Sequence, residues 1–160
     1  MKVWERIKSF DFKQLLQLGR LFIFHPNYIR LTLNASAKAM QVASKEYGNK
    51  HSKSNKANAF RHALWSILLG QAVFKKSQDL KKAKAWSEKV TTLHEKLAPN
   101  STLDRCMDLH NNEIGRNFLD NLITSSEEET ITFLKQKAAQ AKQINNPEDV
   151  DMENLVYISE

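Results

Sequence analysis

The sequence has few of the residues that break helices or cross-link chains. Its 160 residues include four glycines, three prolines and one cysteine. Because Cys106 stands alone, it cannot form an internal disulfide, and a disulfide framework is excluded. So few glycines and prolines argue against a turn-rich β fold and favour long, uninterrupted helices. At this length we expect one domain with a sizeable hydrophobic core.

Long apolar runs are also missing. The most apolar stretch near the N-terminus, residues 21–24, stops at His25 and Pro26, whereas a membrane-spanning helix needs about 20 residues. Glu5 and Asp11 interrupt any apolar segment that would resemble a secretory signal. We therefore expect a cytoplasmic protein, with peripheral contact to a membrane surface as the alternative.

Charge is distributed unevenly along the chain, although the formal net charge is only +6. Residues 1–100 carry 19 Lys and Arg against 6 Asp and Glu, a net of +13, and residues 101–160 carry 5 against 12, a net of −7. The favoured interpretation is that the two segments pack against each other. The alternative is a positive face that binds phosphates, lipid head groups or nucleic acid.

Apolar spacing and capping residues predict an all-α, single-domain bundle of five or six helices. Pro26 suits the first turn of a helix that Gly48 ends, and Pro99 ends another. Ser101 with Asp104 resembles a capping box. The expected helices cover residues 11–24, 26–47, 55–76, 79–98, 101–123 and 126–143.

The chain divides into three parts. Residues 1–50 are expected to supply amphipathic helices packed on the core, and residues 51–143 form the helical core that carries the motifs. Residues 144–160 are an acidic C-terminal tail. The letters LVYIS within this tail indicate either a short extended segment or a docked tail.

Three expected helices each place a histidine on or beside an apolar face: His62, His94 and His110. Taken singly, each histidine is explained as a core residue with a structural role, because buried polar groups are commonly just hydrogen-bonded. Taken together they would be costly to bury unless they satisfy one another, bind a metal or take part in catalysis. Histidines and carboxylates on facing helices are the usual way in which a bundle builds a metal site.

The stretch MDLHNNEIGR, residues 107–116, is the most specific of these signals. Asp108 and Asn112 are four residues apart and can point at one ligand. Asp108 and His110 lie about 200° apart around a regular helix and do not bind one ion unless the helix is distorted. Gly115 costs about 1 kcal/mol relative to alanine within a helix, which indicates close packing or ligand access.

The helix over residues 79–98 carries the pair His94 and Glu95. His94 falls on the apolar stripe with Trp86 and Val90. Glu95 is rotated by about 100° and faces the flank. No second histidine follows at the spacing of a zincin motif.

The leading hypothesis is a metal-assisted hydrolase of a phosphoester or similar anionic bond, with a small molecule or a lipid as substrate. A three-ligand site with an open position activates water, and arginine holds phosphate through two hydrogen bonds. The metal would be zinc, manganese or iron. The expected roles are metal ligand for His62, His94 and Asp108; general base or fourth ligand for Glu95; anion binding for Arg61 and Arg116; orientation of the substrate or the ligands for Asn111 and Asn112; and ligand, acid or core residue for His110.

Two alternatives are not enzymes. A membrane-surface or protein-interaction module would use the aromatic and basic residues of the N-terminal segment, although a face of this kind more simply packs onto the next helix. Nucleic-acid binding would use the basic residues around His51, but no nucleic-acid motif or interleaved aromatic residue accompanies them. The residues of the membrane-surface alternative are Trp4, Phe10, Phe12, Phe22, Ile23 and Phe24 beside Lys2, Arg6, Lys8, Lys13 and Arg20. The basic residues of the nucleic-acid alternative, besides His51, are Lys45, Lys50, Lys53 and Lys56.

The motifs NAFRHALW, LHE and MDLHNNEIGR, in this order, resemble an uncharacterised bacterial domain family. Its members are small standalone proteins and C-terminal modules of larger secreted or toxin-like proteins. The resemblance covers about residues 55–120 and implies that the polar residues of the three motifs act together, but it names no reaction. A weaker similarity, to helical metal-dependent phosphohydrolases with His, His-Asp and Asp ligands, departs at Glu95, where that pattern has aspartate.

Overall fold

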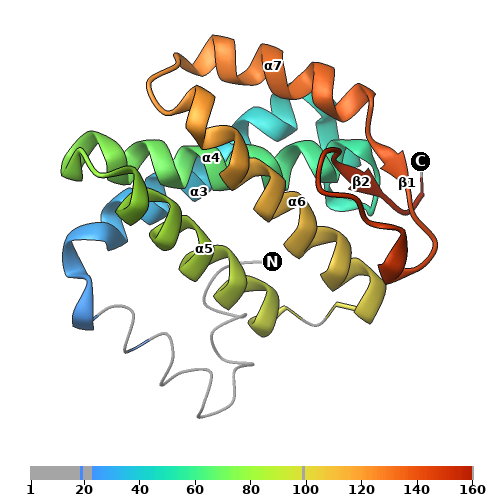
Figure 1. Cartoon of the computed structure of the whole chain (residues 1–160), viewed down its shortest axis with the longest axis horizontal. Helices are drawn as coiled ribbons and strands as arrows, with labels where there is room; N and C mark the ends of the chain where they lie inside the picture. The colour runs from blue at the N-terminus through green and yellow to red at the C-terminus, as the bar shows by residue number, and fades with distance from the viewer. Residues whose placement is uncertain (1–18, 20–22, 99, 160) are drawn as a thin grey trace.

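The computed structural model describes residues 19, 23–98 and 100–159, and these residues form five α-helices with little strand (Figure 1). The all-α prediction is therefore confirmed. The expected helix over residues 11–24 lies for the most part outside the described residues. The elements are α3 (Pro26–Tyr47), a 3-10 helix η1 (Gly48–Ser52), α4 (Lys56–Ser77), α5 (Leu80–Leu97), α6 (Thr102–Leu122), α7 (Glu127–Ala139), β1 (Lys142–Gln143), a 3-10 helix η2 (Pro147–Asp149) and β2 (Val156–Tyr157).

Side-chain caps fix where these helices begin, as the sequence predicts. Asn55, Asp79, Ser101 and Ser126 each accept a hydrogen bond from the backbone N–H three residues later. Ser126 completes a capping box with Glu129. Gly48, with a φ of 59°, ends α3 in a conformation that residues with a side chain rarely adopt.

Helix α4 is the centre of the fold. It packs against α3, α5, α6 and α7, and it crosses the middle of the molecule in Figure 1. Its apolar residues are buried nearly all round, which is the pattern expected of a central helix. Fully buried members include Phe60, Leu64, Ile67 and Val73.

Helices α4 and α6 come unusually close at Gly115. A Cβ atom at this position would lie 2.6 Å from the backbone oxygen of Ala63 and 2.7 Å from its Cα. No side chain fits there, since backbone atoms of a helix cannot move aside cheaply. Of the two alternatives that the sequence left open for Gly115, close packing or ligand access, the structure shows close packing, which brings the polar residues of α6 within reach of α4.

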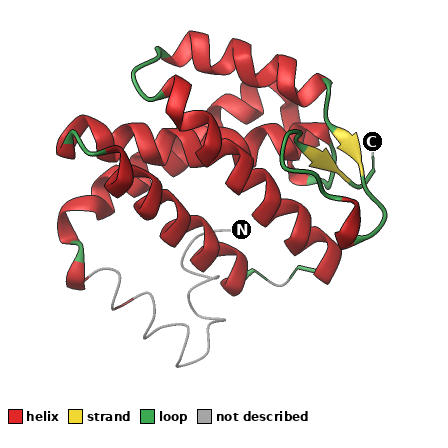
Figure 2. Ribbon diagram, in the orientation of Figure 1, coloured by secondary structure: helices red, strands yellow, loops and turns green. Residues whose placement is uncertain are grey.

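The segment after α7 is a docked part of the domain. Strands β1 and β2 pair in parallel (Figure 2). Between the sequence alternatives for LVYIS, the structure thus has a short strand that also docks. Ile144 and Val156 pack with Met107 of α6, and Leu155 joins the main core.

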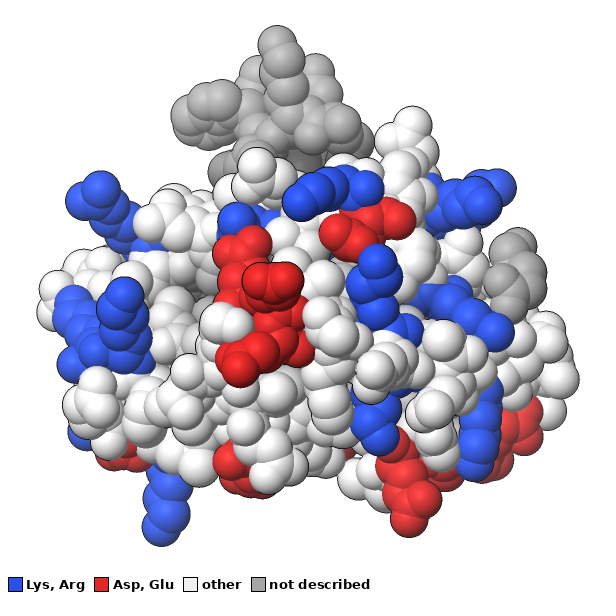
Figure 3. Space-filling model, turned by 90° about the horizontal axis from the view of Figure 1, so that it is seen from above, with Lys and Arg blue, Asp and Glu red and all other residues white. Residues whose placement is uncertain are grey.

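Ion pairs join the basic and acidic parts of the chain. Lys38 pairs with Glu127 at 2.9 Å, and Lys84 pairs with Asp120 at 2.7 Å. On the face shown in Figure 3, basic side chains lie on either side of a central group of acidic ones. The two segments of opposite charge therefore pack together, as the favoured interpretation predicts. Within the described residues, no helix is long and apolar enough to span a bilayer.

Candidate metal site

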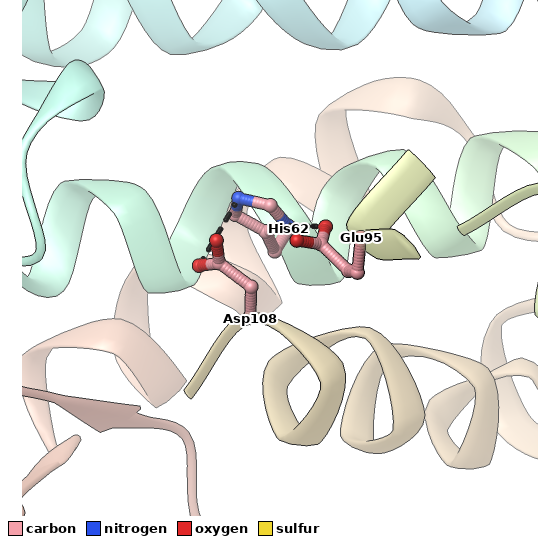
Figure 4. A group of neighbouring side chains, drawn as sticks. All are labelled: His62, Glu95 and Asp108. Atoms are coloured by element: carbon pink, nitrogen blue, oxygen red, sulfur yellow. Dashed lines mark ion pairs between the residues drawn. The ribbon is translucent and has the colours of Figure 1, made fainter. Parts of the chain in front are cut away.

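Three buried ionisable side chains converge from three helices. His62 on α4 lies between Glu95 on α5 and Asp108 on α6 (Figure 4). His62 Nδ1 is 3.6 Å from Glu95 Oε1, and His62 Nε2 is 3.3 Å from Asp108 Oδ1. Each residue offers one ligand atom such that the three atoms lie within 4.8 Å of one another. All three residues are at most 4% exposed, so water does not screen their charges.

The hydrogen bonds around His62 fix its protonation. Arg61 Nη2 donates to His62 Nε2 at 2.6 Å. A guanidinium cannot accept a hydrogen bond, so Nε2 is unprotonated and the proton of the neutral ring is on Nδ1. Asp108 Oδ2 accepts from Asn100 Nδ2 at 3.2 Å, whereas Asp108 Oδ1 makes no hydrogen bond with any described residue. Because Arg61 takes the single lone pair of His62 Nε2, Asp108 Oδ1, 3.3 Å away, is the acceptor left without a donor among the described residues, which favours a proton or a cation at Oδ1.

The electrostatics of the group agree with this geometry. Burial lowers the pKa of His62 well below 6.5, and the nearby charge of Arg61 lowers it further. Burial, followed by the neighbouring charge of Glu95, raises the pKa of Asp108 to about 8, against a smaller opposite effect of Arg61. In the absence of a metal, His62 is thus neutral and Asp108 holds a proton at neutral pH. A divalent cation at this place would replace that proton.

A stripe of small polar residues brings Glu95 into the core. Ser87, Thr91 and Glu95 recur every four residues on α5, and all three are buried. Ser87 Oγ donates to the backbone oxygen of Ser66, and Thr91 Oγ1 donates to that of Ser87. The sequence interpretation that Glu95 faces the flank was wrong, because hydrogen bonds let this polar stripe pack against α4 and α6 as an apolar stripe would.

Asn112 holds Glu95 in place. Its Nδ2 donates to Glu95 Oε1 at 3.4 Å, and its Oδ1 accepts from Ser66 Oγ at 3.2 Å. Asn112 is fully buried. As the four-residue spacing predicts, Asp108 and Asn112 of α6 act on the same group of side chains.

A pocket of about 360 Å³ opens over the group. His62 and Asp108 line it, together with Arg61, whose Nη2 also donates to Asn58 Oδ1 at 2.8 Å. Its other walls combine apolar and polar groups, which is common in ligand sites. They are formed by Ser36, Ala39, Met40, Trp65, His94, Ala98 and Asn100.

His94 lies at this pocket but outside the group of three. Its ring meets the Trp65 ring edge to face, with the centroids 5.0 Å apart. The distances therefore favour Glu95 over His94 as the third candidate ligand. Trp65 is fixed in turn, because its Nε1 donates to Ser36 Oγ at 2.9 Å.

The structure places three other predicted site residues away from the pocket. His110 Nε2 is 2.8 Å from the backbone oxygen of Asn154, and Asn111 makes two hydrogen bonds with the backbone of Val156. Both residues thus hold the C-terminal segment. Arg116 Nη1 donates to Thr91 Oγ1 at 3.4 Å, between α5 and α6. The expected 200° separation of Asp108 and His110 explains why they face different partners.

Sequence reasoning missed Asn100, Ser66 and Trp65 as neighbours of the site. Asn100 lies in the connection between α5 and α6, where no helical periodicity indicates toward which residues a side chain points. Ser66 offered a signal, since it is a small polar residue in an otherwise apolar helix. Trp65 is apolar enough to be taken for core.

Fold and site together define a class: a small all-α protein in which a buried histidine meets two buried carboxylates, with the histidine and one carboxylate, Asp108, lining a pocket. The chain belongs to a family described as a domain of unknown function, DUF6973, whose model matches residues 19–142. The expected membership of an uncharacterised domain family is confirmed, and the match extends beyond residues 55–120 to include α3 and α7. No curated protein and no solved structure matches the chain.

Proposed function

We propose that this protein is a metal-dependent hydrolase that acts on a phosphoester or a similar anionic bond. One observation carries the proposal: three candidate ligands from three helices meet within 4.8 Å, and two of them, His62 and Asp108, line a pocket that also presents an arginine. One imidazole and two carboxylates suit zinc, manganese or iron. Three protein ligands leave positions open for water, which a bound metal makes acidic enough to attack at neutral pH.

Each residue at the pocket has a part in this proposal. His62, Glu95 and Asp108 hold the metal. Arg61, positioned by Asn58, turns from His62 to the anionic group of the substrate, for which a guanidinium is well shaped. His94 lines the same pocket and is the nearest candidate to give a proton to the leaving group.

Metal content tests the first half of the proposal. We expect tag-free protein to hold about one equivalent of zinc, manganese or iron by elemental analysis, and His62→Ala to lose it while keeping its helical content. His110→Ala is the matched control, because His110 is also buried but contacts the C-terminal segment. The absence of metal after reconstitution, or equal loss in both variants, would contradict a site at His62.

Activity tests the second half. The metal-loaded protein should hydrolyse a chromogenic phosphomonoester or phosphodiester, and His62→Ala should not. Arg61→Met should raise KM by about ten- to a hundredfold, as expected when one charged hydrogen bond to an anion is lost. A metal-loaded protein that is inactive on phosphoesters, carboxylic esters and amides would contradict the hydrolase and leave a metal-binding module.

A metal-free network is the competing explanation of the same residues. The raised pKa of Asp108 favours it, because a proton on Oδ1 would neutralise the carboxyl group whose Oδ1 atom accepts no hydrogen bond from any described residue. The two explanations differ in one measurement. Added zinc or manganese should raise the melting temperature of the wild type and leave that of Asp108→Asn unchanged if a metal site exists.

A further inference from the structure

Four of the five large exposed hydrophobic side chains among the described residues lie on α3 or directly before it. Ile23 is 74% exposed and Phe24 70%, immediately before α3; Leu33 is 60% exposed and Met40 47%, on α3 itself. The remaining one, Met152, is 63% exposed in the C-terminal segment. Single exposed hydrophobic residues are ordinary, but several along one helix and its start indicate an interaction surface.

The residues on α3 form a stripe that leads to the pocket. Ile29, Leu33 and Met40 recur at spacings of four and seven residues, so they lie on one face of the helix. Met40 also lines the pocket, as does Ser36, which lies between Leu33 and Met40 in the chain. We call Ile29, Leu33 and Met40 the α3 stripe. The apolar wall of the pocket therefore continues outward onto an exposed surface.

Basic side chains surround the exposed end of this surface. Arg30 is exposed on α3. Lys76 of α4 donates to the backbone oxygen of Asn27 at 3.4 Å, and Lys89 Nζ of α5 is 3.1 Å from His25 Nε2. Three cations from three helices thus lie around the end of α3 that begins next to Ile23 and Phe24. This charge is complementary to a surface of negative charge.

We propose that the α3 stripe, with Ile23 and Phe24, docks on the surface of an anionic phospholipid bilayer. Apolar side chains flanked by lysine and arginine are the composition of helices that lie in a membrane interface. Each basic residue near such a surface adds attraction that salt weakens. On the function proposed above, docking would turn the mouth of the pocket, with Arg61, toward phosphorylated lipid head groups.

Vesicle sedimentation tests the docking surface. Vesicles contain equal parts phosphatidylglycerol and phosphatidylcholine, and the control vesicles contain phosphatidylcholine alone. We expect the wild type to bind the anionic vesicles at low salt and to bind the control vesicles more weakly. Leu33→Glu with Met40→Glu should lower the partition coefficient by at least about tenfold, because two apolar contacts are lost and two negative charges added.

The matched control is Met152→Glu, which makes the same change at a similarly exposed methionine away from α3. This variant should bind vesicles as the wild type does. The proposal is overturned if the wild type stays in solution, if the double variant binds as well as the wild type, or if both vesicle types bind equally. It is also overturned if light scattering shows a dimer that only the double variant loses, because the stripe would then join two copies.

The experiments can contradict the proposed docking surface and the proposed enzymatic activity independently of each other. His62→Ala should lose its metal and still bind anionic vesicles, since His62 is buried and contributes nothing to the stripe. Vesicle binding without metal or activity would keep the docking surface and overturn the enzyme. Metal binding and hydrolysis of a soluble phosphoester without vesicle binding would do the reverse.

Discussion

His62 stands between two carboxylates that cannot both carry a negative charge without compensation in so dry a place. Arg61 lies next to it and supplies part of the positive charge. The raised pKa of Asp108 points to a proton on this residue as the remainder, and a bound cation would take its place. The chemistry of this site is thus decided by which of the two is present.

The first prediction concerns stability without metal. The pKa of Asp108 is about 8 in the folded protein and 3.8 in the unfolded chain, so the folded state holds the extra proton between these values. Stability therefore falls as pH rises through this range. The lowered pKa of His62 makes stability rise with pH, but only below about pH 6.5, so it does not offset the loss of stability from Asp108 above that pH. From pH 6.5 to 8 we expect the free energy of unfolding to fall by about 1–2 kcal/mol.

Urea unfolding of the chelator-treated protein at both pH values measures this fall. Asp108→Asn is the control, since an amide has no proton to lose in this range and the variant should show a flatter dependence. Saturating metal should remove the fall in the wild type, because the carboxylate is then the bound form. Equal slopes for wild type and variant would refute the raised pKa.

The second prediction separates two neighbouring asparagines. Asn112 donates to Glu95, whereas Asn111 binds the backbone of Val156. Asn112→Ala should weaken metal affinity by about 10- to 100-fold, as is typical when a residue that orients a ligand is lost. Asn111→Ala should leave metal affinity unchanged. Competition with a metal-sensitive dye measures both, and the same affinity in the two variants would contradict the positioning role of Asn112.

At the scale of elements, the site depends on how closely α6 approaches α4. Ala63 follows His62 on α4, and Gly115 lies two turns after Asp108 on α6. The missing Cβ atom at Gly115 lets the two helices touch through backbone atoms. This contact fixes the distance across which Asp108 and Asn112 reach His62 and Glu95.

The third prediction compares two glycines. Gly115→Ala should destabilise the protein by about 2–3 kcal/mol, because the new methyl group meets the backbone of Ala63. Gly70→Ala should cost less, since its methyl group meets the flexible end of the Leu119 side chain. Thermal unfolding measures both. A smaller loss for Gly115→Ala than for Gly70→Ala would contradict the close approach of α4 and α6.

At the scale of the whole molecule, the C-terminal segment completes the core on the side of α6 away from the pocket. Met107 is fully buried and packs in one cluster with Ile144 and Val156. His110 and Asn111 hold the backbone of this segment. The polar face of α6 therefore has two functions. Asp108 and Asn112 at one edge belong to the candidate metal site, and His110 and Asn111 at the other edge bind the C-terminal segment.

The fourth prediction tests this fastening. Asn111→Ala leaves the N–H and C=O of Val156 buried without their partners, which should cost about 2–4 kcal/mol of unfolding free energy. The amide of Val156 should exchange hydrogen much faster, and residues 144–159 should become sensitive to protease. Asn145→Ala, at an exposed position, is the control. Unchanged exchange at Val156 would contradict the fastening role.

The sequence predicted the helices well because helix formation is encoded locally. Capping residues at Asn55, Asp79, Ser101 and Ser126 and the left-handed stop at Gly48 are read within a few neighbouring residues. The strand at Val156 was left open, and the strand Lys142–Gln143 was wrongly predicted as the end of the helix over residues 126–143, because the two pair across a loop that no local pattern describes. Core contacts of Ile144 and Val156 with Met107 of α6 accompany this pairing.

The sequence by itself determined an all-α fold and singled out His62, Glu95, Asp108 and Asn112 among the residues of a shared site. It did so because unusual polar residues at helical spacing are costly to bury without a purpose. Only the tertiary structure decided which of them meet. The rotation of α5 buries Glu95 and leaves His94 beside Trp65, and the two edges of α6 separate Asp108 from His110. Helical spacing gives an angle around one axis, whereas the partners found at that angle are set by how the other helices pack.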